Sequence, residues 1–88
     1  MPFYYAYVLA NHRKNFLYIG FTTDLRSRFD SHNLGKIRST RSYRPLKLIH
    51  YEAYAEKSDA KRREKYLKSN RGRTTLMTML KDYFKNRG

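Results

Sequence analysis

The chain of 88 residues has no cysteine, only 7 acidic residues and no long apolar run. Without cysteine it can have neither a disulfide framework nor a thiolate zinc site. No apolar stretch approaches the ~18 residues that a membrane-spanning helix needs. Residues 1–4 have neither a charged leader nor a long apolar region, so we expect no secretory signal and a cytoplasmic protein.

The scarcity of carboxylates also limits the chemistry of the chain. Two-metal nucleases need several clustered carboxylates, and the acids here are too few and too scattered, which leaves at most a one-metal site. The chain has no His-Glu-x-x-His motif, no glycine-rich phosphate loop and no nucleophilic serine or cysteine elbow. Most of the common hydrolase sites are therefore excluded.

Basic residues are abundant: Lys and Arg number 20, and the net charge is +13. Such a charge favours a polyanionic partner, because each phosphate neutralised releases condensed counterions. DNA, RNA, a ribosome or an anionic membrane surface would each satisfy this requirement. An irregular basic loop over residues 36–47, with no acid between Asp30 and Glu52, is the predicted phosphate-contacting segment.

Hydrophobic patterning predicts one domain over residues 1–88 with a thin, aromatic-rich core. Strands are predicted over residues 4–9, 16–20 and 46–54, and helices over residues 24–33, 58–69 and 75–85. The first two strands are spaced as a hairpin, and Gly20 is expected to end the second.

Finer expectations follow from the same patterns. Thr22 or Thr23 is expected to cap the first helix, and Ser58 is expected to cap the second. Residues 70–73 are expected to interrupt the helical structure before the third helix begins. Alternation places Tyr5, Tyr7 and Leu9 on one face of the first strand, and Leu48, His50 and Glu52 on one face of the third. The last helix is expected to bury Leu76, Met79, Leu80 and Phe84.

Two helices carry unusual polar side chains. Arg28 and His32 lie four residues apart on the first helix, beside the apolar stripe of Leu25 and Phe29. On the second helix Glu64 occupies the stripe of Ala60 and Leu67, where an apolar residue is expected. A carboxylate in that position needs a partner, because burying an unpaired charge is costly.

Taken in order, these residues resemble the GIY-YIG nucleases, and in particular their short single-domain bacterial members. Tyr18-Ile19-Gly20 matches one signature literally, and Tyr5-Ala6-Tyr7 matches the other only at its final tyrosine. The resemblance covers nearly the whole chain. Its further matches are Thr22, Asp24-Leu25, Arg28, His32-Asn33, Gly35, Arg44-Pro45-Leu46, Tyr51-Glu52, Ala60, Arg63-Glu64, Leu67-Lys68 and Gly72-Arg73.

The resemblance implies an α/β (α+β) domain with a small three-stranded, mostly antiparallel sheet flanked by three helices in the order ββαβαα. It also implies hydrolysis of phosphodiester bonds with one divalent cation, Mg²⁺ or Mn²⁺. Glu64 would bind the metal, and Arg28 would stabilise charge on the scissile phosphate. Tyr7 and Tyr18 would position or deprotonate the attacking water, and His32 would assist or orient.

Two functions therefore remain open. The first is a metal-dependent endonuclease acting on DNA, with branched, damaged or single-stranded DNA as candidate substrates. The second is a non-catalytic nucleic-acid-binding module on the same scaffold. In both cases the predicted contacts to nucleic acid are Lys36, Arg38, Arg41, Arg44, Arg63, Lys68, Arg71 and Arg73.

Overall fold

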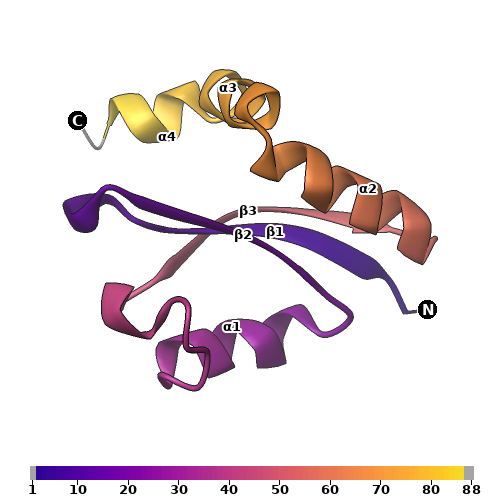
Figure 1. Cartoon of the computed structure of the whole chain (residues 1–88), viewed down its shortest axis with the longest axis horizontal. Coiled ribbons are helices and arrows are strands. Elements are labelled where there is room, and N and C mark those ends of the chain that lie inside the picture. The colour runs from indigo at the N-terminus through magenta and orange to yellow at the C-terminus, as the bar shows by residue number, and fades with distance from the viewer. Residues whose placement is uncertain (1, 87–88) are drawn as a thin grey trace.

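The computed structural model describes residues 2–86, which form three layers with a sheet between helices (Figure 1). Helix α1 covers one face of the sheet, and helices α2, α3 and α4 cover the other (Figure 1). The strands and α-helices are β1 (Tyr4–Asn11), β2 (Phe16–Thr22), α1 (Leu25–Asn33), β3 (Lys47–Tyr54), α2 (Lys57–Lys68), α3 (Asn70–Met79) and α4 (Lys81–Lys85). In this described part no helix is long and apolar enough to span a bilayer.

The sheet has the order β2-β1-β3, and both pairings are antiparallel. The central strand β1 is buried on both faces, with Ala6, Val8 and Leu9 fully enclosed. This arrangement confirms the predicted three-stranded α+β fold. Strand β2 continues to Thr22, so the expectation that Gly20 ends it was wrong: Gly20 is an interior residue paired with Tyr7.

Alternating side chains of the strands pack into two separate hydrophobic cores, one on each face of the sheet. Tyr7, Leu9 and Leu46 form the core on the α1 side. On the opposite side Val8 and Ile19 pack with residues of α2 and α3, including Leu67. The predicted face of β1 is confirmed, and each enclosed aliphatic side chain contributes roughly 1.5–3 kcal/mol through burial.

The predicted face of β3 was wrong. Leu48 pairs with Leu9 and His50 pairs with Val8, so Ile49 is an extra residue in the ladder. Such a bulge reverses the alternation beyond it. Leu48 therefore joins the α1 core, while Glu52 lies on the α2 side, where it contacts Arg63.

The helix boundaries also required corrections. Asp24, and neither Thr22 nor Thr23, caps α1: its carboxylate accepts a hydrogen bond from the Ser27 amide at 3.1 Å. Helix α2 begins at Lys57, directly after Glu56, so Ser58 lies inside the helix and does not cap it.

The C-terminal region forms two helices where one was predicted. These are α3 and α4, which are separated at Leu80. Residues 70–73, where an interruption was expected, make the first turn of α3. The interruption between α2 and α3 falls at Ser69, whose hydroxyl accepts a hydrogen bond from the Gly72 amide at 3.1 Å. A side chain at Gly72 would overlap the backbone of α2, so the two helices meet closely there. Leu76 is buried as expected, but Met79 is 43% exposed.

Candidate active site

Tyr7 and Tyr18 lie together on the α1 side of the sheet. Their ring centroids are 6.2 Å apart, and Tyr7 is 1% exposed. The Tyr7 ring occupies the space where a side chain at Gly20 would stand, because a Cβ there would overlap its Cζ and hydroxyl atoms. Gly20 therefore allows the phenol to cross β2, which is an edge strand of the sheet.

His32 is fully buried beside these rings. Its Nε2 lies 2.8 Å from the Tyr7 hydroxyl, and its Nδ1 lies 2.7 Å from Thr40 Oγ1. Burial and, as a smaller effect, the charge of Arg28 together lower the pKa of His32 from 6.5 to about 4. The imidazole is therefore neutral at physiological pH.

The hydrogen bonds of Thr40 indicate the tautomer of that neutral ring. The Thr40 hydroxyl is directed at the Ile37 carbonyl, 3.5 Å away, which leaves its oxygen to accept a hydrogen bond from the Nδ1–H of His32. We therefore assign the proton to Nδ1, so that Nε2 accepts the hydrogen bond of the Tyr7 hydroxyl. The lone pairs of Tyr7 are then left for another donor.

Burial raises the pKa of Tyr7 to about 12, although hydrogen bonding to Arg28 opposes this effect. Tyr7 is thus a neutral phenol at physiological pH. Hydrogen bonding to Tyr7 in turn raises the pKa of Arg28. The Arg28 Nε is buried and has no hydrogen-bond partner in the described part of the chain. An unsatisfied cationic donor beside two phenols suits an anion.

Glu64 approaches this group from the other layer of the molecule. Helix α2 packs on β1 and β2, and Glu64 is close enough for its charge to raise the pKa of Tyr7. Its side chain is 14% exposed and forms ion pairs with Lys68 Nζ at 2.9 Å and Lys61 Nζ at 3.8 Å. The charge that the sequence placed on an inward stripe is therefore matched by two lysines.

The donor set around Glu64 fits one weakly held hard cation. In residues 2–86 no three side chains of His, Asp or Glu are grouped to hold a metal ion. A single carboxylate, with water and substrate oxygens as the other ligands, suits Mg²⁺ or Mn²⁺. The residues present are consistent with the one-metal site expected from the sequence.

Most of the residues predicted to contact phosphate are exposed on the surface, but two of them form ion pairs with carboxylates of this chain. Lys36, Arg38, Arg41, Arg44, Arg71 and Arg73 are exposed. Lys68 binds Glu64. Arg63 is 28% exposed and donates two hydrogen bonds to Glu52, through Nε at 2.8 Å and Nη2 at 3.2 Å, so it holds α2 against β3. We therefore leave Arg63 out of the proposed nucleic-acid surface.

Two residues that position the site were missed by sequence reasoning. Thr40 lies in the irregular basic loop, where no pattern marks it, yet it is fully buried against His32. Asn33 fixes the end of the same loop with two hydrogen bonds to the backbone of Leu46. Its Nδ2 donates to the Leu46 carbonyl at 2.8 Å, and its Oδ1 accepts from the Leu46 amide at 2.8 Å. Asn33 belongs to the matched motif His32-Asn33, which was the available signal.

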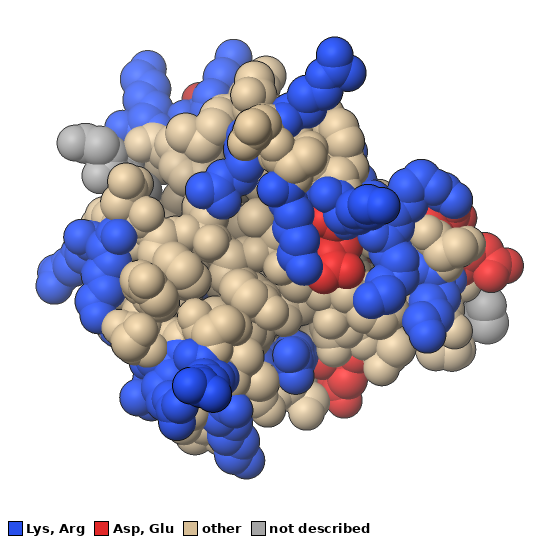
Figure 2. All heavy atoms as spheres, viewed as in Figure 1, with Lys and Arg blue, Asp and Glu red and all other residues tan. Residues whose placement is uncertain are grey.

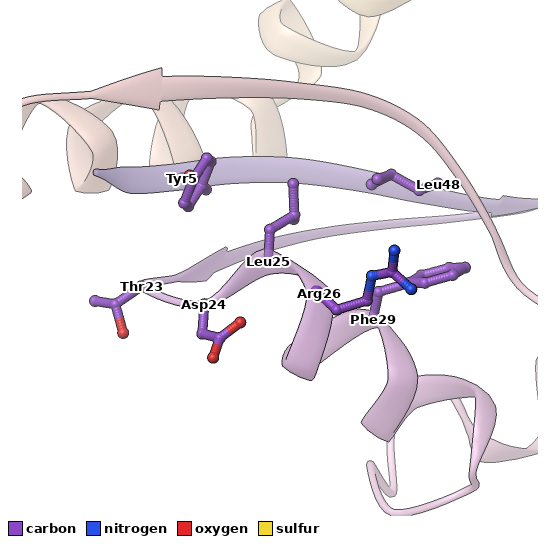
Figure 3. A pocket seen from close by; sticks show the side chains of 7 residues that line it. All are labelled: Tyr5, Thr23, Asp24, Leu25, Arg26, Phe29 and Leu48. Carbon is purple, nitrogen blue, oxygen red and sulfur yellow. The ribbon is translucent and has the colours of Figure 1, made fainter. Parts of the chain in front are cut away.

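A separate hollow lies on the α1 face near β3 (Figure 3). Leu25 projects from α1 toward the sheet there, with Tyr5 above it and Leu48 and Phe29 to one side (Figure 3). None of the five candidate catalytic residues lines this hollow. We therefore place the site at the Tyr7–Gly20 pair instead.

Comparison with known proteins found a matching family model and several similar proteins. A family model described as the GIY-YIG catalytic domain matches residues 3–78. A UPF0213 protein of Staphylococcus haemolyticus strain JCSC1435 is 37% identical over 70 residues, covering 78% of this chain and 84% of the relative. One from Streptococcus pneumoniae serotype 4 is 45% identical over 65 residues, covering 73% and 65%. No solved structure matches the chain.

Proposed function

The chain belongs to the GIY-YIG family, whose members are nucleases, and from this premise we propose that it is a metal-dependent endonuclease that cleaves phosphodiester bonds in DNA. We further propose that residues 1–88 act as a single domain. The observation that carries the proposal is the convergence of Tyr7, Tyr18, Arg28 and His32 beside Gly20, with the Glu64 carboxylate approaching from α2.

Tyr7 is the residue that holds the attacking water. Its hydroxyl proton is directed at His32 Nε2, so its oxygen accepts a hydrogen bond from the water. A pKa of about 12 for Tyr7 and about 4 for His32 disfavours transfer of the phenol proton to the imidazole. His32 therefore orients Tyr7, and Tyr18 supplies a second hydroxyl beside the water.

Arg28 binds the scissile phosphate. Its guanidinium is held next to both phenols, and its unpaired buried Nε is available to an anionic oxygen. A cation fixed before the substrate arrives stabilises the charge that develops on the phosphate without reorganisation during the reaction.

Glu64 would hold the divalent cation. When bound, such a cation stabilises negative charge on the phosphate and on the departing oxygen. Lys61 and Lys68 must first release the carboxylate, and their ammonium groups are then free to contact neighbouring phosphates. In this proposal Lys68 has two successive partners, the carboxylate and the nucleic acid.

The alternative is a module that binds nucleic acid without cutting it. The pairing of Glu64 with two lysines favours this alternative, because a carboxylate committed to ammonium groups is a poor metal ligand. Retention of both tyrosines, Arg28 and Glu64 in one arrangement favours the enzyme.

Glu64→Gln separates the two functions. Wild-type protein is incubated with plasmid, branched DNA and single-stranded DNA in Mg²⁺, Mn²⁺ or EDTA, beside Glu64→Gln and Asp59→Asn. Both variants raise the net charge equally, and Asp59 is a more exposed acid on the same helix. We expect metal-dependent cleavage by wild type and Asp59→Asn, and a loss of at least about 100-fold in Glu64→Gln, the scale for removing a transition-state-stabilising group. Equal cleavage by both variants, or none with any metal, contradicts the enzyme proposal.

A further inference from the structure

A second cleft lies where the β1–β2 hairpin meets helices α3 and α4. It is lined by Phe16 and Leu17 of β2, Arg73 and Met77 of α3, and Tyr83 and Phe84 of α4. We call it the hairpin cleft. None of the candidate catalytic residues belongs to it.

The lining of the hairpin cleft suits a flat apolar ligand with a negative charge nearby. Three aromatic rings and an exposed methionine border it. Phe16 is already stacked face to face on Tyr43, with ring centroids 3.8 Å apart, so one of its faces is covered, whereas Met77 is 50% exposed. Arg73 is its one charged residue among the described residues, and no acid lines it. Aromatic side chains beside a cation form the usual platform for nucleobases and their phosphates.

The hairpin cleft adjoins the proposed site along β2. Leu17 directly precedes Tyr18 but packs on the opposite face of the sheet, with Val8 and Ile19. Because β2 is an edge strand, a nucleic-acid strand can pass around it from one face to the other, and Leu17 and Gly20 are separated along β2 by about 10 Å at the usual rise of a strand. That span corresponds to about three steps of a nucleic-acid strand at duplex spacing, and fewer if the strand is stretched. A strand whose phosphate lies at Arg28 can therefore place a nearby base in the cleft.

Basic residues connect the two places. Lys68 contacts Glu64, and exposed Arg71 and Arg73 follow along α3 toward the cleft. In Figure 2 the face toward the viewer has a broad uncharged area bordered by Lys and Arg side chains. A backbone that follows the basic border can thus leave its bases over uncharged surface.

We propose that the hairpin cleft binds an unpaired nucleobase close to the scissile phosphate, so that the enzyme acts on single-stranded or frayed DNA. The base must be unpaired because in a duplex both of its faces are covered by neighbouring base pairs, and protein rings can stack only on an exposed face. This inference rests on the proposed endonuclease function and gives it a substrate class.

Methyl NMR tests the cleft directly. Met77 lies in it, while Met79, on the same helix and 43% exposed, does not line it and serves as the internal control. The protein, labelled at its methionine methyl groups, is titrated in EDTA with an oligothymidylate of about eight nucleotides, a length within the usual site size of single-strand binders. We expect the Met77 signal to shift with the single strand and the Met79 signal to stay. An 8-base-pair duplex of blunt ends should leave both unchanged.

A matched pair of variants measures the contribution to affinity. Met77→Glu and Met79→Glu change the net charge equally and alter exposed positions. We expect Met77→Glu to weaken single-strand binding about tenfold relative to Met79→Glu, the scale for loss of one stacked base. Equal affinities, or an unshifted Met77 signal, overturn the proposal. A Met77 shift that depends on protein concentration without DNA also overturns it, because the cleft would then hold a second copy of the chain.

Base binding in the hairpin cleft and endonuclease activity are tested separately by these experiments. Binding in EDTA requires no chemistry, so a Met77 shift without cleavage in any metal supports the cleft and contradicts the endonuclease. Cleavage that is equally fast on duplex and single strands, with no Met77 shift, supports the endonuclease and contradicts the cleft.

Discussion

At the scale of single residues, the site depends on what Gly20 lacks. The Tyr7 ring passes over Gly20 and reaches His32, and any side chain at this position overlaps that ring. The glycine of the Tyr18-Ile19-Gly20 triplet is thus required because Tyr7, on the neighbouring strand β1, occupies the space of a side chain there. Gly20 itself is an interior residue of β2.

Gly20→Ala is therefore expected to destabilise the protein by about 1–3 kcal/mol, the usual cost of overpacking. The check is urea unfolding of the variant in wild-type and Tyr7→Ala backgrounds. Because the overlap is with the Tyr7 ring, the cost should largely vanish when that ring is removed. A cost that is the same in both backgrounds would place the strain elsewhere.

His32 makes stability depend on pH. Its pKa is lowered from 6.5 to about 4 in the folded protein, first by burial and then by Arg28. Between these values the unfolded chain binds more protons, so stability falls as pH falls from about 6.5 to about 4, by at most about 3 kcal/mol. Below pH 4 both states are protonated and the loss is complete.

Urea unfolding at several pH values between 5 and 7 tests this. The pKa of Glu52 is lowered from 4.5, because hydrogen bonds from Arg63, His50 and Tyr54 outweigh burial, so its loss begins below this window. We expect the slope to disappear in His32→Gln and to persist in the control His12→Gln, which alters an exposed histidine. An unchanged slope in His32→Gln would assign the dependence to another group.

At the scale of elements, helix α2 is fixed to the sheet by a polar cluster. Glu52 of β3 accepts hydrogen bonds from Arg63 of α2 at 2.8 and 3.2 Å, and from the Tyr54 hydroxyl. Its carboxylate also lies 2.9 Å from His50 Nε2. Because Arg63 precedes Glu64, this cluster sets the position of the proposed metal ligand.

Glu52→Gln should destabilise the protein by about 1–3 kcal/mol, because it leaves a partly buried guanidinium with a weaker partner. Asp59→Asn is the control, since it removes an exposed ion pair with Arg62 on the same helix and should cost about 0–1 kcal/mol. Chemical denaturation of both variants provides the comparison. Equal losses would show that the Glu52 cluster is no stronger than a surface pair.

At the scale of the whole molecule, charge is the dominant property. A net charge of +13 on 88 residues is carried by Lys and Arg side chains, many of which project around the border of the visible face (Figure 2). Binding to nucleic acid should therefore release counterions and weaken with salt.

Substitution of Lys36, Arg38 and Arg41 by Gln tests which cations take part. Loss of three phosphate contacts should reduce the slope of log affinity against log salt by about 2 for single strands, at about 0.7 per contact. The measurement is fluorescence anisotropy at several salt concentrations. Lys57, Lys65 and Lys81 to Gln is the control, with the same charge change at exposed positions outside the predicted contacts. The same slope change in both triple variants would show that general charge, rather than the basic loop, governs binding.

Most strands and helices were predicted from local patterns of hydrophobic and polar residues. The alternation of Tyr7, Val8 and Leu9 predicted the faces of β1, and the spacing of Ala60, Glu64 and Leu67 predicted an unusual carboxylate that is in fact only 14% exposed. The bulge at Ile49 could not be predicted, because it arises from pairing with a strand far away in sequence. The close meeting of Gly72, in the first turn of α3, with the backbone of α2 is also a tertiary contact.

The sequence by itself determined the charge and most of the strands and helices, because composition and periodicity are properties of residues close together along the chain, and its ordered motifs carried the resemblance to the family. Only the tertiary structure decided the partners: Thr40 and Tyr7 for His32, Glu52 for Arg63, and Lys61 and Lys68 for Glu64. The ionisation of Tyr7 and His32 was decided there as well. Both depend on burial and on charges brought together by folding, which no local pattern of residues encodes.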